Sequence, residues 1–240
     1  MRMKLLYELQ NCTLDLDYRR MLLSFIKKSL EENDKDFFQE MYRKEPKTKQ
    51  FTFSTHLSQA KYTEDCVLLD KPEFEMRFST ADYGIFVKLY NSLLRQKNIA
   101  FPIKHHNVLK LLRIYLENET AINTEELFIY FVSPLVVREH LREANKDNYY
   151  IYSDEQFLPC LKTIIKNDIE GHELLTGSMV DNLVIETVSG KFVLVKAFGS
   201  RIPASLGKFR LQGDKRLLKH LFDSGIGSRR GEGFGMFNLM

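Results

Sequence analysis

The residue types best suited to chemistry gather in the last sixteen residues of the chain. Five glycines lie within eleven positions, and two arginines lie among them. Glycine permits tight turns and close approach of the backbone, and successive N–H groups in such a turn can bind an anion. The guanidinium of arginine adds donors whose geometry suits phosphate. The pattern predicts a loop that binds a phosphodiester through Gly225, Gly227, Arg229, Arg230, Gly231, Gly233 and Gly235.

Two familiar glycine motifs do not fit this spacing. A dinucleotide-binding G-x-G-x-x-G motif needs a glycine where Arg230 stands. A P-loop needs Gly-Lys followed by Ser or Thr, whereas Gly207-Lys208 is followed by Phe209. A flexible linker is also disfavoured, because Phe234 and its neighbours are apolar. We therefore expect an ordered loop followed by a terminal strand.

Positive charge is concentrated in the part of the chain that contains this loop. Residues 191–240 hold 10 Lys/Arg against 3 Asp/Glu, whereas the preceding 190 residues hold 25 against 29. Such an asymmetry is typical of a surface that meets a polyanion. A solvated basic face is the competing interpretation.

The overall composition excludes several other classes of protein. The chain has 240 residues and is 44% hydrophobic, but no stretch reaches the ~18 apolar residues of a membrane span. The first residues carry an acidic side chain and no long apolar region, so a cytoplasmic location is predicted. The three cysteines are far apart and are expected to be reduced. No metal site and no cofactor are expected.

The elements that must position the loop follow an order that repeats. In the first half, apolar spacing predicts a strand at 3–9, helices at 18–30 and 37–42, strands at 51–56 and 74–79, a helix at 85–94 and a strand at 100–116. After a polar connection at 117–126, it predicts a strand at 127–137, a helix at 155–169, strands at 183–187, 192–198 and 207–211, a helix at 215–222 and a strand at 234–239. Two β-α-β-β-α-β units account for this order. The predicted fold class is α+β, with two tandem ferredoxin-like domains at 1–118 and 124–240 and a C-terminal glycine-rich loop.

Local signals mark some of the boundaries between these elements. Asp82 is expected to cap the helix at 85–94, and Gly225 is expected to end the helix at 215–222. The strand at 100–116 is expected to bend at His105-His106. A turn at Ser189-Gly190 is expected to join the strands at 183–187 and 192–198.

The glycine spacing resembles that of a known group of proteins. Gly225-Ile226-Gly227, five residues and then Gly233-Phe234-Gly235 match the C-terminal G-h-G-x(5)-G-h-G loop of the RAMP superfamily. The segments 49–54, 74–82 and 133–137 also resemble segments of the CRISPR repeat-processing endoribonuclease, the Cas-six family of that superfamily. The resemblance extends over nearly the whole chain.

The resemblance implies a reaction and a set of partners. The reaction is metal-independent cleavage of precursor CRISPR RNA within each repeat, in which a ribose 2′-OH attacks the adjacent phosphate. The products are a 2′,3′-cyclic phosphate and a 5′-OH. CRISPR repeat RNA is the expected partner, and transfer of the product to an effector complex and a homodimer are left open.

The resemblance also suggests catalytic residues. Lys49, two positions before Phe51, matches a lysine that precedes the family's Phe-Thr-Phe-Ser strand. The family's histidine is not matched, and Arg43 occupies the nearest equivalent position. The helical tyrosine is also absent, with Ser24 or Lys28 in its neighbourhood. Lys49, Arg43 and Lys28 are therefore candidates for stabilising charge or transferring a proton.

His56 is the natural substitute for the missing histidine. It shares a strand face with Thr52 and Ser54, opposite Phe51 and Phe53, so we expect it to point toward solvent or ligand. The pKa range of histidine suits proton transfer. An exposed histidine with no catalytic task is the alternative. Two other functions also remain open, a non-catalytic RNA-binding protein of the same fold and a structural RAMP subunit of an effector complex.

Overall fold

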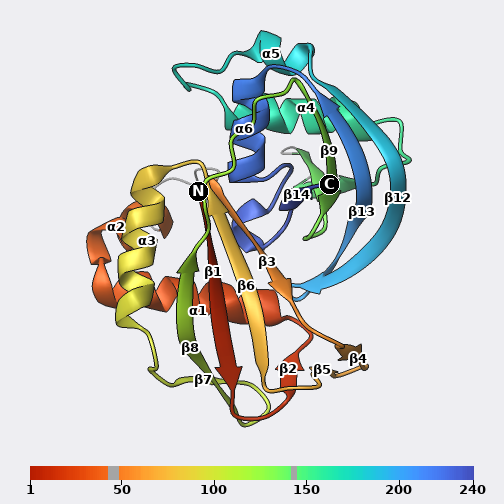
Figure 1. The fold of residues 1–240 in the computed structure, drawn as a ribbon. Helices are drawn as coiled ribbons and strands as arrows, with labels where there is room; N and C mark the ends of the chain where they lie inside the picture. The colour runs from red at the N-terminus through yellow and green to blue at the C-terminus, as the bar shows by residue number, and fades with distance from the viewer. Residues whose placement is uncertain (43–48, 142–144) are drawn as a thin grey trace.

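The computed structural model describes residues 1–42, 49–141 and 145–240, and it has two α+β halves side by side (Figure 1). The N-terminal half is red to green, and the C-terminal half is green to blue. One buried apolar core lies within residues 3–111 and a second within 122–237. Among the residues that the structure describes, none of the helices combines the length and the apolar composition of a membrane span.

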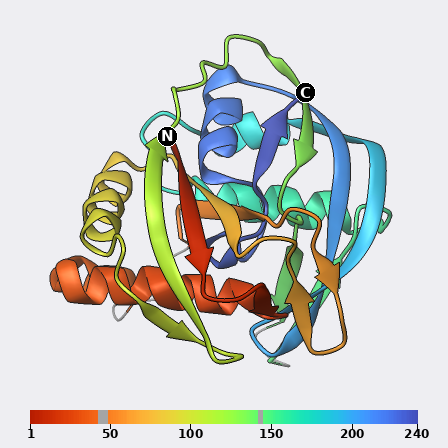
Figure 2. The same ribbon diagram turned by 60° about the horizontal axis from the view of Figure 1, so that its bottom comes forward.

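The N-terminal half is built on one antiparallel sheet with the strand order β3-β6-β1-β8-β7. Helices α1 and α3 cover the face of the sheet that carries its apolar side chains (Figure 2). The elements of this half are β1 (Arg2–Leu9), β2 (Thr13–Asp15), α1 (Tyr18–Asn33), α2 (Lys35–Tyr42), β3 (Phe51–His56), β4 (Lys61–Tyr62), β5 (Cys66–Leu68), β6 (Glu73–Thr80), α3 (Tyr83–Arg95), β7 (Phe101–Ile103) and β8 (Asn107–Leu116). Strands β2, β5 and β4 form a separate small sheet.

The C-terminal half repeats this plan with the strand order β12-β13-β9-β14. Helices α4 and α6 supply the apolar side chains that pack on the sheet. The elements are β9 (Glu126–Phe131), β10 (Val137–Leu141), β11 (Lys146–Tyr150), α4 (Phe157–Asp168), α5 (Gly177–Asp181), β12 (Val184–Ala197), β13 (Ser200–Gln212), α6 (Lys215–Ser224), η1 (Arg230–Glu232) and β14 (Phe237–Leu239). Strands β10 and β11 form a hairpin of their own.

The two halves have the same topology. In each half the second, third, first and fourth strands of a β-α-β-β-α-β unit lie in that order across the sheet. This arrangement confirms the predicted α+β class with two tandem ferredoxin-like folds.

Local sequence explains where several elements begin and end. Along β6, Phe74, Met76 and Phe78 are buried while the intervening side chains are more exposed, as alternation requires. The carboxylate of Asp82 accepts a hydrogen bond of 2.9 Å from the backbone N–H of Ile85 and caps α3.

Two expectations about strands were wrong. The segment 100–116 is a hairpin of β7 and β8 rather than one bent strand, because His105 and His106 both adopt positive φ, at 60° and 49°. The strands expected at 183–187 and 192–198 form one strand, β12, which turns back at Phe198-Gly199. A register shift between Thr187 and Ser189 occurs where a turn was expected. An irregularity of this kind bends a strand without ending it.

Two further segments are shorter as strands than their apolar character suggests. Of the residues expected as a strand at 127–137, only those up to Phe131 belong to β9. Of those expected at 234–239, only the last belong to β14. The intervening residues instead bond to one another, with the N–H of Gly235 donating to Pro134 O and that of Val132 donating to Met236 O.

Candidate active site

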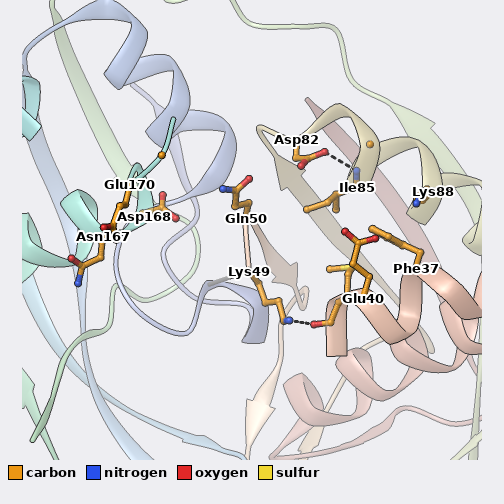
Figure 3. A pocket seen from close by; sticks show the side chains of 13 residues that line it. Phe37, Glu40, Lys49, Gln50, Asp82, Ile85, Lys88, Asn167, Asp168 and Glu170 are labelled. Carbon is orange, nitrogen blue, oxygen red and sulfur yellow. Dashed lines mark hydrogen bonds between the residues drawn. The ribbon is translucent and has the colours of Figure 1, made fainter. Parts of the chain in front are cut away.

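Lys49 enters a cleft between the two halves of the protein. It lies just before β3, facing helices α1 and α2 on one side and α4 with the glycine-rich segment 225–235 on the other. The cleft consists of two adjoining cavities of about 740 and 520 Å³, and Lys49 lines both. Figure 3 shows the larger cavity, with Lys49 at its edge. Cavities of this size are typical of sites that enclose a small ligand.

The ammonium group of Lys49 is in an unusual environment. Its Nζ donates a hydrogen bond to the carbonyl oxygen of Met41 and lies 4.9 Å from the centroid of the Tyr42 ring. Burial lowers the pKa of Lys49, and the nearby charge of Lys27 lowers it further. A lysine with a lowered pKa gives up its proton more readily than a free lysine does.

Tyr42 and Lys27 were not among the predicted site residues. Lys27 Nζ lies 4.8 Å from the centroid of the same Tyr42 ring, and it pairs with no carboxylate among the described residues. The hydroxyl of Tyr42 is buried without a hydrogen-bond partner among the described residues, and burial raises its pKa. Tyr42 is therefore a neutral phenol whose hydroxyl donates to no acceptor among the residues that the structure describes. Its position at the end of a predicted helix, seven residues before Lys49 in the chain, was the available sequence signal.

The glycine-rich segment packs against the N-terminal half. All five predicted glycines are buried. At Gly233, φ is +86° and a Cβ would lie 2.4 Å from the ring of Phe53 in β3. At Gly231 a Cβ would lie 2.8 Å from Lys49 Cβ. The close approach that these glycines permit is thus to Phe53 and to Lys49, and contact of the segment with RNA stays a prediction.

Arg230 is engaged within the C-terminal half. Its guanidinium is buried, pairs with Asp168 at the end of α4 and donates to the carbonyl oxygens of Ser224 and Gly225 at 3.3 and 3.2 Å. His220 Nε2 on α6 lies 3.1 Å from the same carboxylate. Burial alone would raise the pKa of Asp168, but the bond with His220 and the charge of Arg230 hold it below its usual value. This network joins α4, α6 and the glycine-rich segment.

Arg229 is better placed than Arg230 to meet a ligand. It is half-buried at the cleft, where Nη1 lies 2.9 Å from Glu232 Oε2 and Nη2 donates to the hydroxyl of Tyr149 at 3.0 Å. Arg138 lines the same cavity. Among the described lining residues of that cavity, five are cationic and one is a carboxylate, namely Lys27, Lys49, Arg138, Arg229, Arg230 and Glu232. The cavity favours a polyanion.

His56 lies at the other end of β3 from Lys49. It is exposed and is paired in register with Glu75 of β6. From Phe51 to His56 an extended strand covers about 17 Å. Thr52, on the same face, is buried and donates to Phe234 O at 2.6 Å. The exposure that was expected for this face is therefore found only at its His56 end. The structure does not bring His56 to the cleft.

Of the remaining two catalytic candidates, one lies away from the cleft and the other is not among the described residues. Lys28 is exposed on α1, with Nζ 3.6 Å from Glu32 Oε1 and 5.5 Å from the centroid of the Phe101 ring. Arg43 lies in 43–48, outside the described residues.

One family model and several solved structures are similar to this chain. Residues 116–239, more than half of the chain, match the family described as CRISPR associated protein Cas6, C-terminal. Two solved structures resemble the whole chain with a TM-score of 0.84 at 20% identity. One is described as a Cas6-related gene from Pyrococcus furiosus, of which 98% is covered, and the other as an RAMP protein binding different RNA substrates, of which 99% is covered. A Cas6 product complex, covered in full, gives a TM-score of 0.73 at 16% identity. No curated protein sequence matches the chain.

Proposed function

The chain belongs to the Cas6 family, and on that premise we propose that it is an endoribonuclease that cleaves precursor CRISPR RNA within each repeat without a metal ion. The family relationship supports a role in processing CRISPR repeat RNA. The observation that carries the proposal is the cationic cavity of about 520 Å³ in which Lys49 lies beside Tyr42 and Lys27. Transfer of the mature guide RNA to an effector complex is part of the same proposal.

The proposed reaction is an internal transesterification. The 2′-oxygen forms a bond to the adjacent phosphorus, the bond from phosphorus to the 5′-oxygen breaks, and the proton lost by the 2′-OH is balanced by one gained at the 5′-oxygen. The products are a 2′,3′-cyclic phosphate and a 5′-OH. Because the nucleophile belongs to the substrate, alignment supplies much of the rate. The protein must stabilise the phosphorane charge and move two protons.

The cleft offers groups for these tasks. Lys49 is proposed to stabilise the charge that develops on the phosphorane, since a cation in a partly desolvated site acts most strongly on developing charge. The hydroxyl of Tyr42, which has no hydrogen-bond partner in the described part of the chain, is a second donor at the same place. His56, Arg43 and Lys28 stay proposed for proton transfer, and Arg43 directly follows Tyr42 in the chain.

A cleavage assay tests this proposal. Repeat RNA incubated with the protein in EDTA should be cut, and a substrate with one 2′-deoxy nucleotide immediately upstream of the scissile phosphate should bind with nearly normal affinity but resist cleavage. Lys49→Ala should slow cleavage, whereas Lys208→Ala, an exposed lysine on β13, should not. A strict requirement for magnesium, or rapid cleavage of the deoxy substrate, would show that water rather than the 2′-OH is the nucleophile.

A non-catalytic RNA-binding protein is the second candidate. Neither of the two cavities that Lys49 lines includes a histidine among its described lining residues. The similar RAMP protein is described only as binding different RNA substrates. Tight binding of repeat RNA without any cleavage, at protein concentrations above that of the RNA, would favour this function.

A further inference from the structure

Helix α3 carries a stripe of apolar side chains that stays largely exposed. Tyr83, Val87, Tyr90 and Leu94 follow one another at spacings of four, three and four residues, so they form one line along the helix over roughly 16 Å. Tyr83 is 71% exposed and Leu94 is 48% exposed, while Val87 and Tyr90 are half-buried. These four residues are called the α3 seam below.

The α3 seam points away from both the core and the cleft. The buried side of the helix is formed by Leu89, Ser92 and Leu93, and the middle of the seam lies roughly 130° around the helix axis from them. Ile85 and Lys88, on the side opposite the seam, line the larger cavity of the cleft. In both ribbon views α3 lies on the side of the N-terminal half away from β12 and β13 (Figure 1, Figure 2). The seam is therefore a surface separate from the candidate active site.

The segment that contains the seam has no acidic residue. Residues 83–116 hold six Lys/Arg and no Asp/Glu, although acidic residues outnumber basic ones by 29 to 25 over residues 1–190. Arg95 and Lys97, at the C-terminal end of the seam, are exposed and pair with no carboxylate in the described part of the chain. Glu32 of α1 accepts a hydrogen bond from Gln96, whose side chain is buried on the other side of the helix. The charge beside the seam thus favours an acidic partner.

The spacing of the seam indicates what kind of partner fits it. Helices pair along apolar lines with alternating spacings of three and four residues, and tyrosine is among the residues that contribute most to protein interfaces. We propose that the α3 seam docks an amphipathic α-helix of an acidic partner protein, whose Asp or Glu side chains lie beside Arg95 and Lys97. A second copy of this chain is a poorer fit, because its own α3 carries no carboxylate. The inference goes beyond the proposed function and does not depend on RNA cleavage.

Binding of designed helical peptides to the full chain, followed by fluorescence anisotropy, tests the seam. The probe is a three-heptad peptide with leucine at the two apolar positions of each heptad and glutamate beside them. A second peptide has lysine in place of each glutamate. The acidic peptide should bind, and the basic peptide should bind about tenfold more weakly or less, because like charges would meet at the interface.

Two double variants of the protein separate the apolar contact from the charge. Tyr83→Ala with Leu94→Ala should weaken binding of the acidic peptide by about tenfold or more, as loss of central apolar contacts does. Arg95→Glu with Lys97→Glu should instead reverse the preference, so that the basic peptide binds more tightly than the acidic one. All four side chains are exposed, so these changes should leave the fold intact.

Matched controls use exposed residues of the same types outside α3. Tyr115→Ala with Leu174→Ala, and Lys191→Glu with Lys208→Glu, should leave the affinities for both peptides unchanged. A wild-type protein with no affinity for the acidic peptide would overturn the inference, as would equal affinities in the seam variants and their controls.

Other occupants of the seam would give different results. A dimer in sedimentation velocity that the Tyr83→Ala, Leu94→Ala variant loses would identify a second copy of the chain and overturn the inference. A loss of repeat RNA affinity in that variant, with peptide binding unchanged, would identify RNA and overturn it as well. Peptide binding that follows the expected pattern supports the inference even where repeat RNA is not cut, a result that would count against the nuclease proposal alone.

Discussion

Loss of the Asp168 carboxylate should destabilise the protein far more than loss of a surface carboxylate. Asp168 lies between the Arg230 guanidinium, which is 3% exposed, and His220, which is 7% exposed. Asp168→Ala leaves the charge of Arg230 buried and without its carboxylate. Removing one partner of a buried ion pair costs about 3–5 kcal/mol. For a chain of this length that corresponds to a fall in Tm of roughly 6–20 °C.

A matched control is available on the protein surface. Arg210 pairs with Glu126 at 2.5 Å and with Glu186 at 2.9 Å, and these carboxylates are exposed. Glu126→Ala should therefore cost about 1 kcal/mol or less. In the double variant Asp168→Ala with Arg230→Met, the unpaired charge is also removed. Its loss of stability should be smaller than the sum of the two single losses, by about 1–3 kcal/mol.

Urea denaturation followed by circular dichroism measures these differences in the free energy of unfolding. The advantage of wild type over Asp168→Ala should also depend on pH. Because the pKa of Asp168 is lower in the folded protein than the ~3.9 of an unfolded chain, the ionised carboxylate stabilises the fold above that pH. Its contribution is lost as the pH falls toward the folded-state pKa. If Asp168→Ala costs no more than Glu126→Ala at pH 7, the buried pair does not stabilise the fold as reasoned.

Three further substitutions test the cleft. Lys49→Ala should reduce the rate of single-turnover cleavage by about 100- to 1000-fold. It should change the Kd for a 2′-deoxy repeat RNA by less than about threefold. Equal losses of cleavage rate and of RNA affinity would assign Lys49 to binding only. If His56 transfers a proton, His56→Ala should slow cleavage by about 100- to 10,000-fold. A normal rate would leave that role to Arg43, Lys28 or Lys44. Gly233→Val should lower the free energy of unfolding by roughly 2 kcal/mol or more, because it strains positive φ and meets the Phe53 ring. A Gly233→Val protein with wild-type stability in urea would contradict the observed packing.

The local elements of this fold could be predicted from the sequence. Alternation in 74–79, helical spacing in 18–30 and the Asp82 cap are set by residues close together in the chain, so their signal is independent of the rest of the protein. Two β-α-β-β-α-β units then followed from element order. The prediction of one bent strand at 100–116 was wrong because His105 and His106 both adopt positive φ, and these two residues form the turn of a hairpin.

The site depended much more on tertiary structure. The sequence indicated that the glycines allow close approach, but not that Phe53 and Lys49, about 180 residues earlier, are what approach them. The adjacent residues Arg229 and Arg230 had the same interpretation in the sequence, and only packing against Asp168 distinguishes the buried side chain of Arg230 from that of Arg229 at the cleft. Burial and pKa are properties of a side chain's surroundings. Those surroundings are assembled from both halves of the chain, so no local pattern specifies them.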